Sequence, residues 1–183
     1  MRLAPRLLSL CLLALATPAL AEGEDPSGGT LNPEEMTIGR VLDDVARGQT
    51  TMTNCATGYL ITKSGRHAQA RQVFGACAEA GYTGAMTWMS QLDNNGLGAP
   101  EDPDAAAGWD RRAAEAGDPV GQFNYGLDLM RGRGVRQDEA AGRRMVDAAA
   151  EQGLPVARRL QDAGYDLDEV TPDADNWKYA PLF

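Results

Sequence analysis

The chain has few of the residues from which enzymes build catalytic sites. Its 183 residues include one histidine, His67, three cysteines and 6% aromatic residues. A single histidine excludes a Ser-His-Asp triad, a Cys-His pair and a multi-histidine metal site within one copy of the chain. We therefore expect a protein that is not an enzyme and that holds neither a metal ion nor a cofactor. His67 follows a Gly-Arg turn, so we expect it to face solvent at a helix start.

Basic residues are scarce relative to acids. The 17 lysines and arginines against 26 aspartates and glutamates give a formal charge of −9, which disfavours nucleic acid as a partner. Seven of the arginines are concentrated between Arg131 and Arg159. Such a run would attract anionic lipid headgroups, but interleaved acids favour helix faces that neutralise their own charge. Any membrane contact is therefore expected to be peripheral.

No apolar run in the chain is long enough to cross a bilayer. The run from Leu7 to Ala16 has about half of the roughly 20 residues that a transmembrane helix needs. Arg2 and Arg6 precede it, and Ala19-Leu20-Ala21 after it forms a small-x-small cleavage pattern. We interpret residues 1–21 as a secretory signal peptide. We expect a periplasmic location, with the extracellular medium as second choice.

The rest of the chain is of single-domain size. Removal of 21 of the 183 residues would leave 162, enough for one continuous core. Residues 22–31 are rich in glycine, serine, glutamate and aspartate, and we predict that they form a disordered stub.

An internal repeat organises the remaining residues. A glycine closes an Ala-rich, Glu-containing segment at three positions 36 residues apart, namely Gly81, Gly117 and Gly153. The same offset aligns two Gly-x-Gly segments, at 96–98 and 132–134, and pairs Asp102 with Asp138. Self-similarity with a period of 20–50 residues is typical of stacked helix pairs.

Each repeat is predicted to hold two helices. In the second unit, apolar residues recur at i, i+3, i+4 and i+7 on one face of the first helix: Ala85, Trp88, Met89 and Leu92. The Gly-x-Gly segment then ends this helix. Asp102 is placed to cap the next helix, and Pro103 suits its first position. In the third unit Asp118, Pro119 and Asp138 repeat these start signals.

These signals resemble a known repeat family. The segment GRGVRQD, from Gly132 to Asp138, and the later AAEQG, which ends at Gly153, are similar to the Sel-one-like repeat, a relative of the tetratricopeptide repeat. The resemblance implies an all-α fold, a short right-handed α-solenoid of stacked antiparallel helix pairs. Gly142 and Met145 stand where the family usually has alanine and often has tryptophan, which implies a looser helix pair.

The first unit is shorter than the others. It resembles a plain tetratricopeptide hairpin, with Gly58, Ala70 and Phe74 at that family's small, small and aromatic positions. The resulting plan is a helical repeat domain at 32–164, made of a capping helix at 33–47, units at about 51–81, 82–117 and 118–153, and a final helix at 155–163. Residues 165–183 would form an acidic and aromatic tail.

Two cysteines follow the signal peptide, Cys55 and Cys77. Residues that face each other across an antiparallel helix pair have a constant index sum, and these two have the same sum as Gly58 with Phe74. The tetratricopeptide register of the first unit therefore makes a disulfide geometrically reasonable, and disulfides persist outside the cytoplasm. The alternative is two buried thiols that act as small apolar fillers.

In tetratricopeptide arrays the first helix of each pair lines the concave face. Transferred through the register of Gly58, Ser90 and Gly126, the resemblance implies a partner-binding groove lined by Tyr59, Lys63, Thr87, Gln91, Asn95, Phe123, Leu127 and Arg131. Phe123 and Leu127 fit a buried core equally well.

The carboxyl-terminal residues are unusually apolar for a tail. Four large apolar side chains crowd the last seven residues: Trp177, Tyr179, Leu182 and Phe183. They would either cover the open end of the last helix pair, which every solenoid has to cap, or dock into a partner. Both interpretations stay open at this point.

The function expected from these features is that of a non-catalytic protein–protein interaction module, monomeric on its own. The family resemblance implies an adaptor, regulator or accessory subunit at the periplasmic face of an inner-membrane complex. The alternative is a cysteine-rich Sel-one-like hydrolase, or a cell-wall protein that binds penicillin or peptidoglycan. The chain lacks the Ser-x-x-Lys arrangement that would support this alternative.

Overall fold

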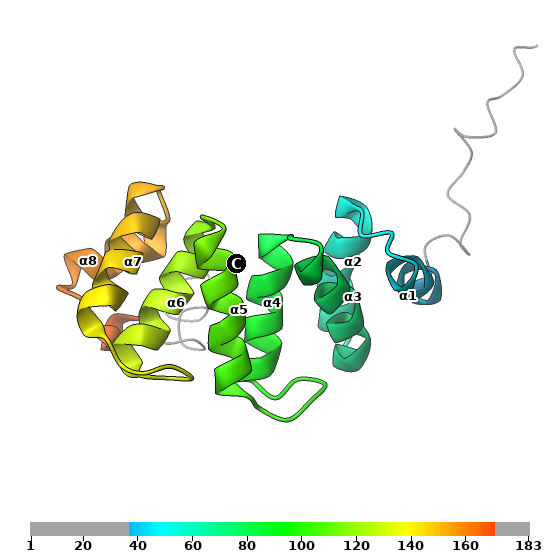
Figure 1. Cartoon of the computed structure of the whole chain (residues 1–183), viewed down its shortest axis with the longest axis horizontal. Coiled ribbons are helices and arrows are strands. Elements are labelled where there is room, and N and C mark those ends of the chain that lie inside the picture. Colours follow the sequence, from blue (N-terminus) through cyan, green and yellow to red (C-terminus); the bar gives the residue numbers. More distant parts are fainter. Residues whose placement is uncertain (1–36, 171–183) are drawn as a thin grey trace, which may run out of the picture. The chain divides into compact units, whose positions relative to one another are not determined.

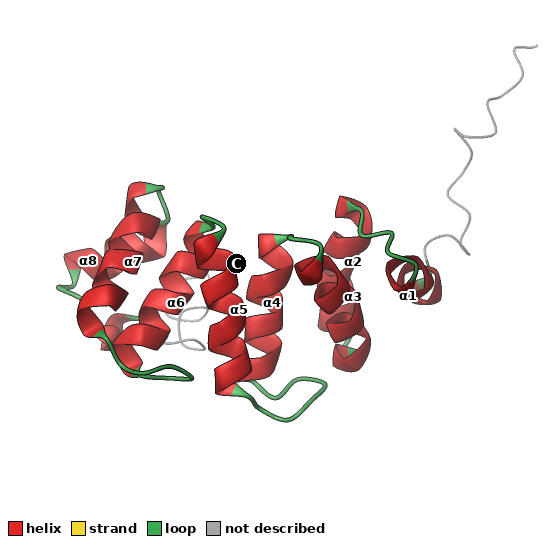
Figure 2. Ribbon diagram, in the orientation of Figure 1, coloured by secondary structure: helices red, strands yellow, loops and turns green. Residues whose placement is uncertain are grey.

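The computed structural model describes residues 37–170, and the regular structure of this part of the chain is helical (Figure 1, Figure 2). Its elements are α1 (Ile38–Ala46), α2 (Met52–Lys63), α3 (His67–Glu79), α4 (Thr83–Asn94), α5 (Pro103–Glu115), α6 (Pro119–Arg131), α7 (Glu139–Glu151), α8 (Pro155–Asp162) and the short 3-10 helix η2 (Leu167–Glu169). The predicted signal peptide (1–21), the predicted stub (22–31) and residues 171–183 of the tail lie outside the described residues.

The helices follow one another in chain order and stack as pairs (Figure 1). The pairs are α2 with α3, α4 with α5, and α6 with α7, and each pair contacts the next through α3 with α4 and through α5 with α6. At the two ends, α1 packs on α2 and α3, and α8 packs on α7. The predicted all-α fold of stacked antiparallel helix pairs is therefore confirmed.

Aspartates begin the helices as the repeat pattern predicted. Asp102 accepts a hydrogen bond from the Ala105 N–H at 3.0 Å at the start of α5, and Asp138 accepts one from the Ala141 N–H at 2.9 Å at the start of α7. Asp118 caps α6 in the same way. Each carboxylate satisfies backbone N–H groups that have no partner inside the helix. The repeat in the sequence is thus largely a repeat of local helix start signals.

The Gly-x-Gly loops end α4 and α6 and pack against the preceding second helix. Gly132 ends α6 in the left-handed region, with φ of 69°. A Cβ atom on Gly134 would lie 2.0 Å from the Pro103 carbonyl oxygen at the start of α5. One on Gly98 would lie 2.6 Å from the Ala68 nitrogen near the start of α3. The second glycine of each loop is required because backbone there touches backbone of the neighbouring element.

Two clusters of buried side chains form the core of the described range. The amino-terminal cluster joins α1 to α5 and includes Ile61, Val73 and Leu92, each at most 1% exposed. The carboxyl-terminal cluster spans α6 to η2 and includes Val146 and Leu160, both 0% exposed. Burial of such aliphatic side chains, about 1.5–3 kcal/mol each, supplies the main driving force for stacking.

The chain stays folded beyond the final predicted helix. The sequence placed a tail from residue 165, yet Val170 is 1% exposed and packs in the carboxyl-terminal cluster with the partly buried Tyr165 and Leu167. The Tyr165 hydroxyl donates to Asp147 Oδ1 at 2.5 Å. Residues 165–170 are therefore part of the domain, because their apolar side chains add to its core.

The first described helix begins later than the sequence suggested. We predicted a start at Pro33, but α1 begins at Ile38. Thr37 has extended backbone, and its hydroxyl accepts a hydrogen bond from the Arg40 N–H at 3.2 Å. Thr37 is therefore the N-cap, since its side chain supplies the acceptor that the first turn lacks.

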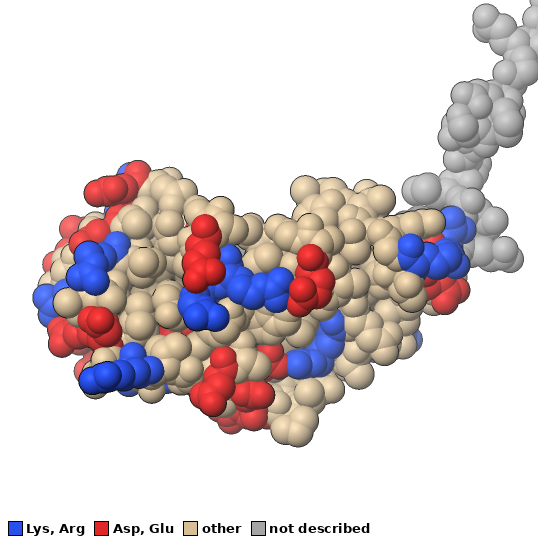
Figure 3. Space-filling model, viewed as in Figure 1, with Lys and Arg blue, Asp and Glu red and all other residues tan. Residues whose placement is uncertain are grey.

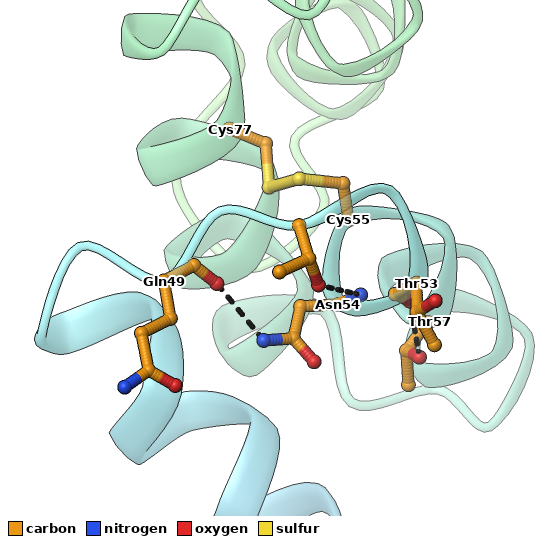
Figure 4. The surroundings of a disulfide bond; sticks show 7 residues. Gln49, Thr53, Asn54, Cys55, Thr57 and Cys77 are labelled. Carbon is orange, nitrogen blue, oxygen red and sulfur yellow. Dashed lines mark hydrogen bonds between the residues drawn. A yellow bond between two sulfur atoms is a disulfide. The ribbon is translucent and has the colours of Figure 1, made fainter.

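The predicted disulfide is present and links α2 to α3 (Figure 4). The Cα atoms of Cys55 and Cys77 are 5.8 Å apart, and both residues are buried. Beside the bridge, Asn54 Nδ2 donates to the Gln49 carbonyl oxygen at 2.9 Å (Figure 4). This hydrogen bond ties the connection after α1 to the first turn of α2, so the amino-terminal end of the stack is held by both covalent and polar links.

Candidate functional site

Three neighbouring hollows are lined mainly by α2, α4 and α6, the first helices of the pairs. The apolar pocket is lined by Met52, Cys55, Ala56, Tyr59, Phe74, Tyr82, Thr83, Gly84, Ala85 and Trp88. The central hollow is lined by Thr62, Lys63, Gly65, His67, Thr87, Trp88, Gln91, Leu97, Val120 and Asn124. The acidic cavity, of about 150 Å³, is lined by Ser90, Gln91, Asn94, Asp110, Phe123, Asn124, Leu127, Asp128, Arg131, Arg133 and Val170.

Shared residues show that these hollows adjoin one another, and we call the three together the groove. Trp88 lines both the apolar pocket and the central hollow. Gln91 and Asn124 line both the central hollow and the acidic cavity. A ligand that lies along the groove would therefore contact three successive helix pairs.

Aromatic rings form the wall of the apolar pocket. The Phe74 ring stacks on Trp88 with centroids 5.6 Å apart, and the Tyr59 ring lies 5.5 Å from that of Trp88. The Lys63 ammonium group lies 5.4 Å from the centre of the Tyr59 ring. Met52 is 69% exposed. This end of the groove therefore offers apolar and aromatic surface to a partner.

The central hollow is mixed in character. Thr87 and Gln91 of α4 line it together with Lys63 and His67. His67 begins α3, as predicted, but it is half-buried rather than facing solvent. The Gly98 loop packs against the backbone of His67 and Ala68. Hydroxyl, amide, imidazole and ammonium groups give this part of the groove both hydrogen-bond donors and acceptors.

The acidic cavity contains a buried carboxyl group from α5, that of Asp110, which is 1% exposed. The Ser90 hydroxyl donates to its Oδ2 atom, and Asn124 Nδ2 donates to its Oδ1 atom at 3.2 Å. Burial raises the pKa of Asp110 to about 7, an effect that the Ser90 hydrogen bond opposes and that the charge of Asp128 strengthens. Asp110 is therefore oriented by two donors and titrates near neutral pH.

A second buried carboxyl group reaches the same cavity from α6. Asp128 is 7% exposed, and its Oδ2 atom is buried without a hydrogen-bond partner in the described part of the chain. Burial raises the pKa of Asp128 to about 7, although Arg133 and Arg131 lower it. An unpartnered acceptor of this kind is costly to bury.

Two arginines border the cavity and are engaged by other protein groups. Arg131 Nη2 donates to the Val170 carbonyl oxygen at 2.5 Å. Arg133 Nη2 donates to the Asn94 carbonyl oxygen at 3.1 Å and to Glu101 Oε1 at 3.0 Å. The guanidinium group of Arg133 therefore has its own carboxylate outside the cavity.

Sequence reasoning missed both buried aspartates, although the repeat register holds a signal for them. At the offset of 36 residues, Asp110 aligns with Val146 and Asp128 aligns with Leu92. Both of these apolar residues are 0% exposed. In each case one unit has an acid where the other has a buried apolar residue. Acids at core positions break the packing rule, and such exceptions are often functional sites.

Seven of the eight predicted groove residues line the three hollows: Tyr59 the apolar pocket, Lys63 and Thr87 the central hollow, Gln91 the central hollow and the acidic cavity, and Phe123, Leu127 and Arg131 the acidic cavity. Asn95 instead caps α4, and its Nδ2 donates to the Gln91 carbonyl oxygen at 2.8 Å. Phe123 and Leu127 are 6% and 8% exposed, so they belong to the core as well as to the cavity wall.

Outside the groove, charges of both signs interleave on the face drawn in Figure 3. Arg143 pairs with Glu139 at 2.5 Å, and Arg112 pairs with Glu79 at 2.9 Å. Across residues 37–170, no three histidine, cysteine or acidic side chains are grouped as a metal site would require. None of the helices described there has the length and apolar character needed to cross a membrane.

No family model and no curated protein matches the sequence. A Sel1 repeat protein from Oxalobacter formigenes has a similar structure, with a TM-score of 0.57 and 25% identity over 67% of this chain and 95% of that one. A protective antigen present in uropathogenic Escherichia coli strains, which displays an SLR fold, gives a TM-score of 0.50 and 27% identity over 54% of this chain but 22% of its own.

Cysteine-rich protein B of Helicobacter pylori is similar in fold alone, with a TM-score of 0.52 and 18% identity over 69% of this chain and 98% of that one. Stacked helix pairs with capped starts define the described part of the chain as a helical repeat protein. Its fold is that of the Sel1-like repeat proteins.

Proposed function

We propose that this protein is a non-catalytic adaptor that binds an extended segment of a partner protein along its groove. The continuity of the three hollows carries the proposal. Trp88, Gln91 and Asn124 each line two of them, so one segment is able to contact all three helix pairs. Repeat arrays use such surfaces, made of equivalent positions in successive units, for binding.

The groove changes character along its length, which defines the partner segment. Aromatic rings and the exposed Met52 suit an apolar anchor at the α2 end. Thr87 and Gln91 suit polar groups or backbone amides in the middle. Interfaces draw most of their affinity from a few buried anchors and use the surrounding polar contacts for orientation. An apolar residue followed by a polar stretch is the simplest segment that satisfies both parts.

The site of action that we propose is extracytoplasmic. The predicted signal peptide supports it, and so does the Cys55–Cys77 disulfide, because such bonds persist in oxidising compartments. Within that setting we propose the periplasm, and a role as regulator or accessory subunit at the periplasmic face of an inner-membrane complex. The protein would be a monomer until it joins that complex.

Site-specific photo-cross-linking tests the groove. A photoreactive amino acid in place of Thr87 is expected to capture a protein in intact cells of the producing species. The matched control is the same amino acid in place of Glu115, whose side chain is 68% exposed on α5 outside the groove. A product at residue 87 that is absent at residue 115, and absent again when Trp88→Ala is added, supports the proposal. Equal capture at both positions would rule it out.

We propose a separate role for the aromatic tail, which would either cap the stack or dock on the partner. The side chains concerned are Trp177, Tyr179, Leu182 and Phe183. Deletion of residues 177–183 distinguishes the two roles. A drop in the melting temperature of several degrees supports capping. Unchanged melting together with loss of the residue 87 cross-link supports docking. Turnover of a chromogenic β-lactam by the intact protein would instead favour the hydrolase alternative.

A further inference from the structure

We infer that the acidic cavity is a binding site for the primary ammonium group of a lysine side chain. The inference deepens the proposed function and rests on it, because a segment that lies in the groove, from the partner or from this chain's own tail, would supply the lysine. The cavity adjoins the central hollow through Gln91 and Asn124, so a segment in the groove passes its entrance.

Two of the residues that line the cavity have side-chain oxygen atoms that accept no hydrogen bond within the described part of the chain. Asp128 Oδ2 is buried without a partner in the described range, and the residue as a whole is 7% exposed. Asn94 Oδ1, which lines the same cavity, is also buried without a partner. An ammonium group has three N–H donors and no acceptor, so it complements two such oxygen atoms.

The charges around the cavity leave it net negative when both acids are ionised. Asp110 and Asp128 both line it. Of the two arginines at its border, Arg133 pairs with Glu101 at 3.0 Å, whereas Arg131 donates to the neutral Val170 carbonyl oxygen and keeps its charge. Two carboxylates beside the guanidinium group of Arg131 attract an added cation, and burial strengthens the attraction.

The fold does not need these acids. The third unit has Val146 where the second has Asp110, and the second unit has Leu92 where the third has Asp128; both aliphatic residues are fully buried. Ser90 and Asn124 donate to the two oxygen atoms of Asp110 and hold its carboxyl group in place. Polar groups retained and oriented at core positions indicate a ligand.

The cavity has room for an ammonium group. Its volume is about 150 Å³, well above the roughly 10–15 Å³ that one water molecule needs on the same kind of measure. The space therefore admits the end of an aliphatic amine. Two sources offer this chemistry, a lysine of the partner and Lys178 of this chain, which follows the cavity residue Val170 by eight positions.

The test uses the full-length protein and a blocked lysine, Nα-acetyl-lysine methylamide, as the probe. Nitrogen-15 NMR at pH 8 follows the side-chain amide signals of Asn94 and Asn124 during titration. We expect saturable shifts with the probe and none with its Nε-acetylated form, which has the same length but no charge. Equal responses to both forms would overturn the inference. Because this titration uses the unaltered protein, misfolding of a variant is not an explanation for its result.

Variants then locate the site. Asp128→Asn is expected to weaken binding of the probe at least tenfold, while Asp104→Asn, an exposed acid on α5, leaves it unchanged. Undiminished binding to a folded Asp128→Asn protein would also overturn the inference. Tighter binding to the Lys178→Gln protein identifies the chain's own lysine as the natural occupant, and unchanged binding identifies a partner lysine. Groove cross-linking is measured separately, so a failed probe titration and a failed partner search are distinguishable.

Discussion

In the first helix pair Gly58 of α2 faces the ring of Phe74, and in the second pair Ser90 of α4 donates a hydrogen bond to Asp110. These are equivalent contacts, because Phe74 and Asp110 stand 36 residues apart in the repeat. The first pair fills the position with an aromatic ring and adds a disulfide a turn away. The second fills it with a buried acid.

The third pair shows which of these is the ordinary solution. There Gly126 faces Val146, and a Cβ atom on the glycine would lie 3.0 Å from the valine methyl group. Two of the three pairs thus use a glycine against an apolar side chain, and the polar pair is the exception. The comparison indicates that the first pair is built for stability, whereas the second gives up stability to keep a polar site in the groove.

The largest expected effect comes from removing the covalent link of the first pair. The bridge closes a separation of 22 residues in sequence. Constraint of the unfolded chain by a loop of that size contributes about 3 kcal/mol. The double variant Cys55→Ala, Cys77→Ala should lose this amount in urea unfolding, and a reductant should destabilise the wild type but not the variant. An unchanged unfolding midpoint would contradict the prediction.

A methyl group at the contact of the first pair should have the next largest effect. In Gly58→Ala the new Cβ atom would lie 2.6 Å from the Phe74 ring, which is held by its stacking on Trp88. We expect a loss of about 2 kcal/mol from overpacking. Gly75→Ala on α3 is the matched control, because nothing lies within 4 Å of a Cβ atom there. Thermal unfolding of both proteins measures the difference, and similar melting temperatures would refute the idea.

The acidic cavity, which lies where the second and third pairs meet, should respond in the opposite direction, and only above acid pH. Burial raises the pKa of Asp128 from 3.8 to about 7, so between these values the folded protein binds more protons than the unfolded chain. The free energy of unfolding therefore falls as pH rises from about 4 to about 7 and levels off above it. Asp128→Asn removes this term. It should be more stable than the wild type by about 1.5 kcal/mol at pH 8, and nearly equal to it at pH 4.

Urea unfolding at several pH values checks this prediction. A variant that is less stable than the wild type at pH 8 would show that the carboxylate is a structural group. It would also contradict the idea that the acidic cavity gives up stability for binding.

The smallest effect is expected on the charged outer surface. Arg143 is an exposed residue that pairs with Glu139 at 2.5 Å and lies 4.8 Å from the centre of the Tyr165 ring. Exposed ion pairs of this kind contribute about 0.5 kcal/mol or less. Arg143→Gln should therefore unfold within about 0.5 kcal/mol of the wild type in a thermal scan. A loss as large as that of Gly58→Ala would contradict the division between the stabilising helix contacts and the outer surface.

Much of the fold is readable from the chain because its signals are local. Three helices are capped by an aspartate whose carboxylate accepts a hydrogen bond from a backbone N–H two or three residues later: Asp102, Asp118 and Asp138. The start of α1 was misplaced for a related reason. Asn32-Pro33 and Thr37 are both valid start signals, and the choice between them depends on which turn packs against α2 and α3.

The groove was only partly predictable. Thr87 and Gln91 follow from the register of the first helices. The dual role of Phe123 and Leu127, as core and as cavity wall, depends on how far α7 covers α6. The folding of residues 165–170 onto the core likewise depends on contacts that no periodic pattern displays.

By itself, then, the sequence determined the helix pairs, their capped starts and their glycine stops, since each depends on neighbours along the chain or on a repeated interval. It made the pairing of Cys55 with Cys77 geometrically reasonable, and the structure shows the bridge. The tertiary structure decided that Asp110 and Asp128 share one cavity. They lie on different helices, and only the packing of α5 on α6 removes both from water and sets them beside the same empty space. Burial, which no local signal specifies, is what gives these two acids their chemistry.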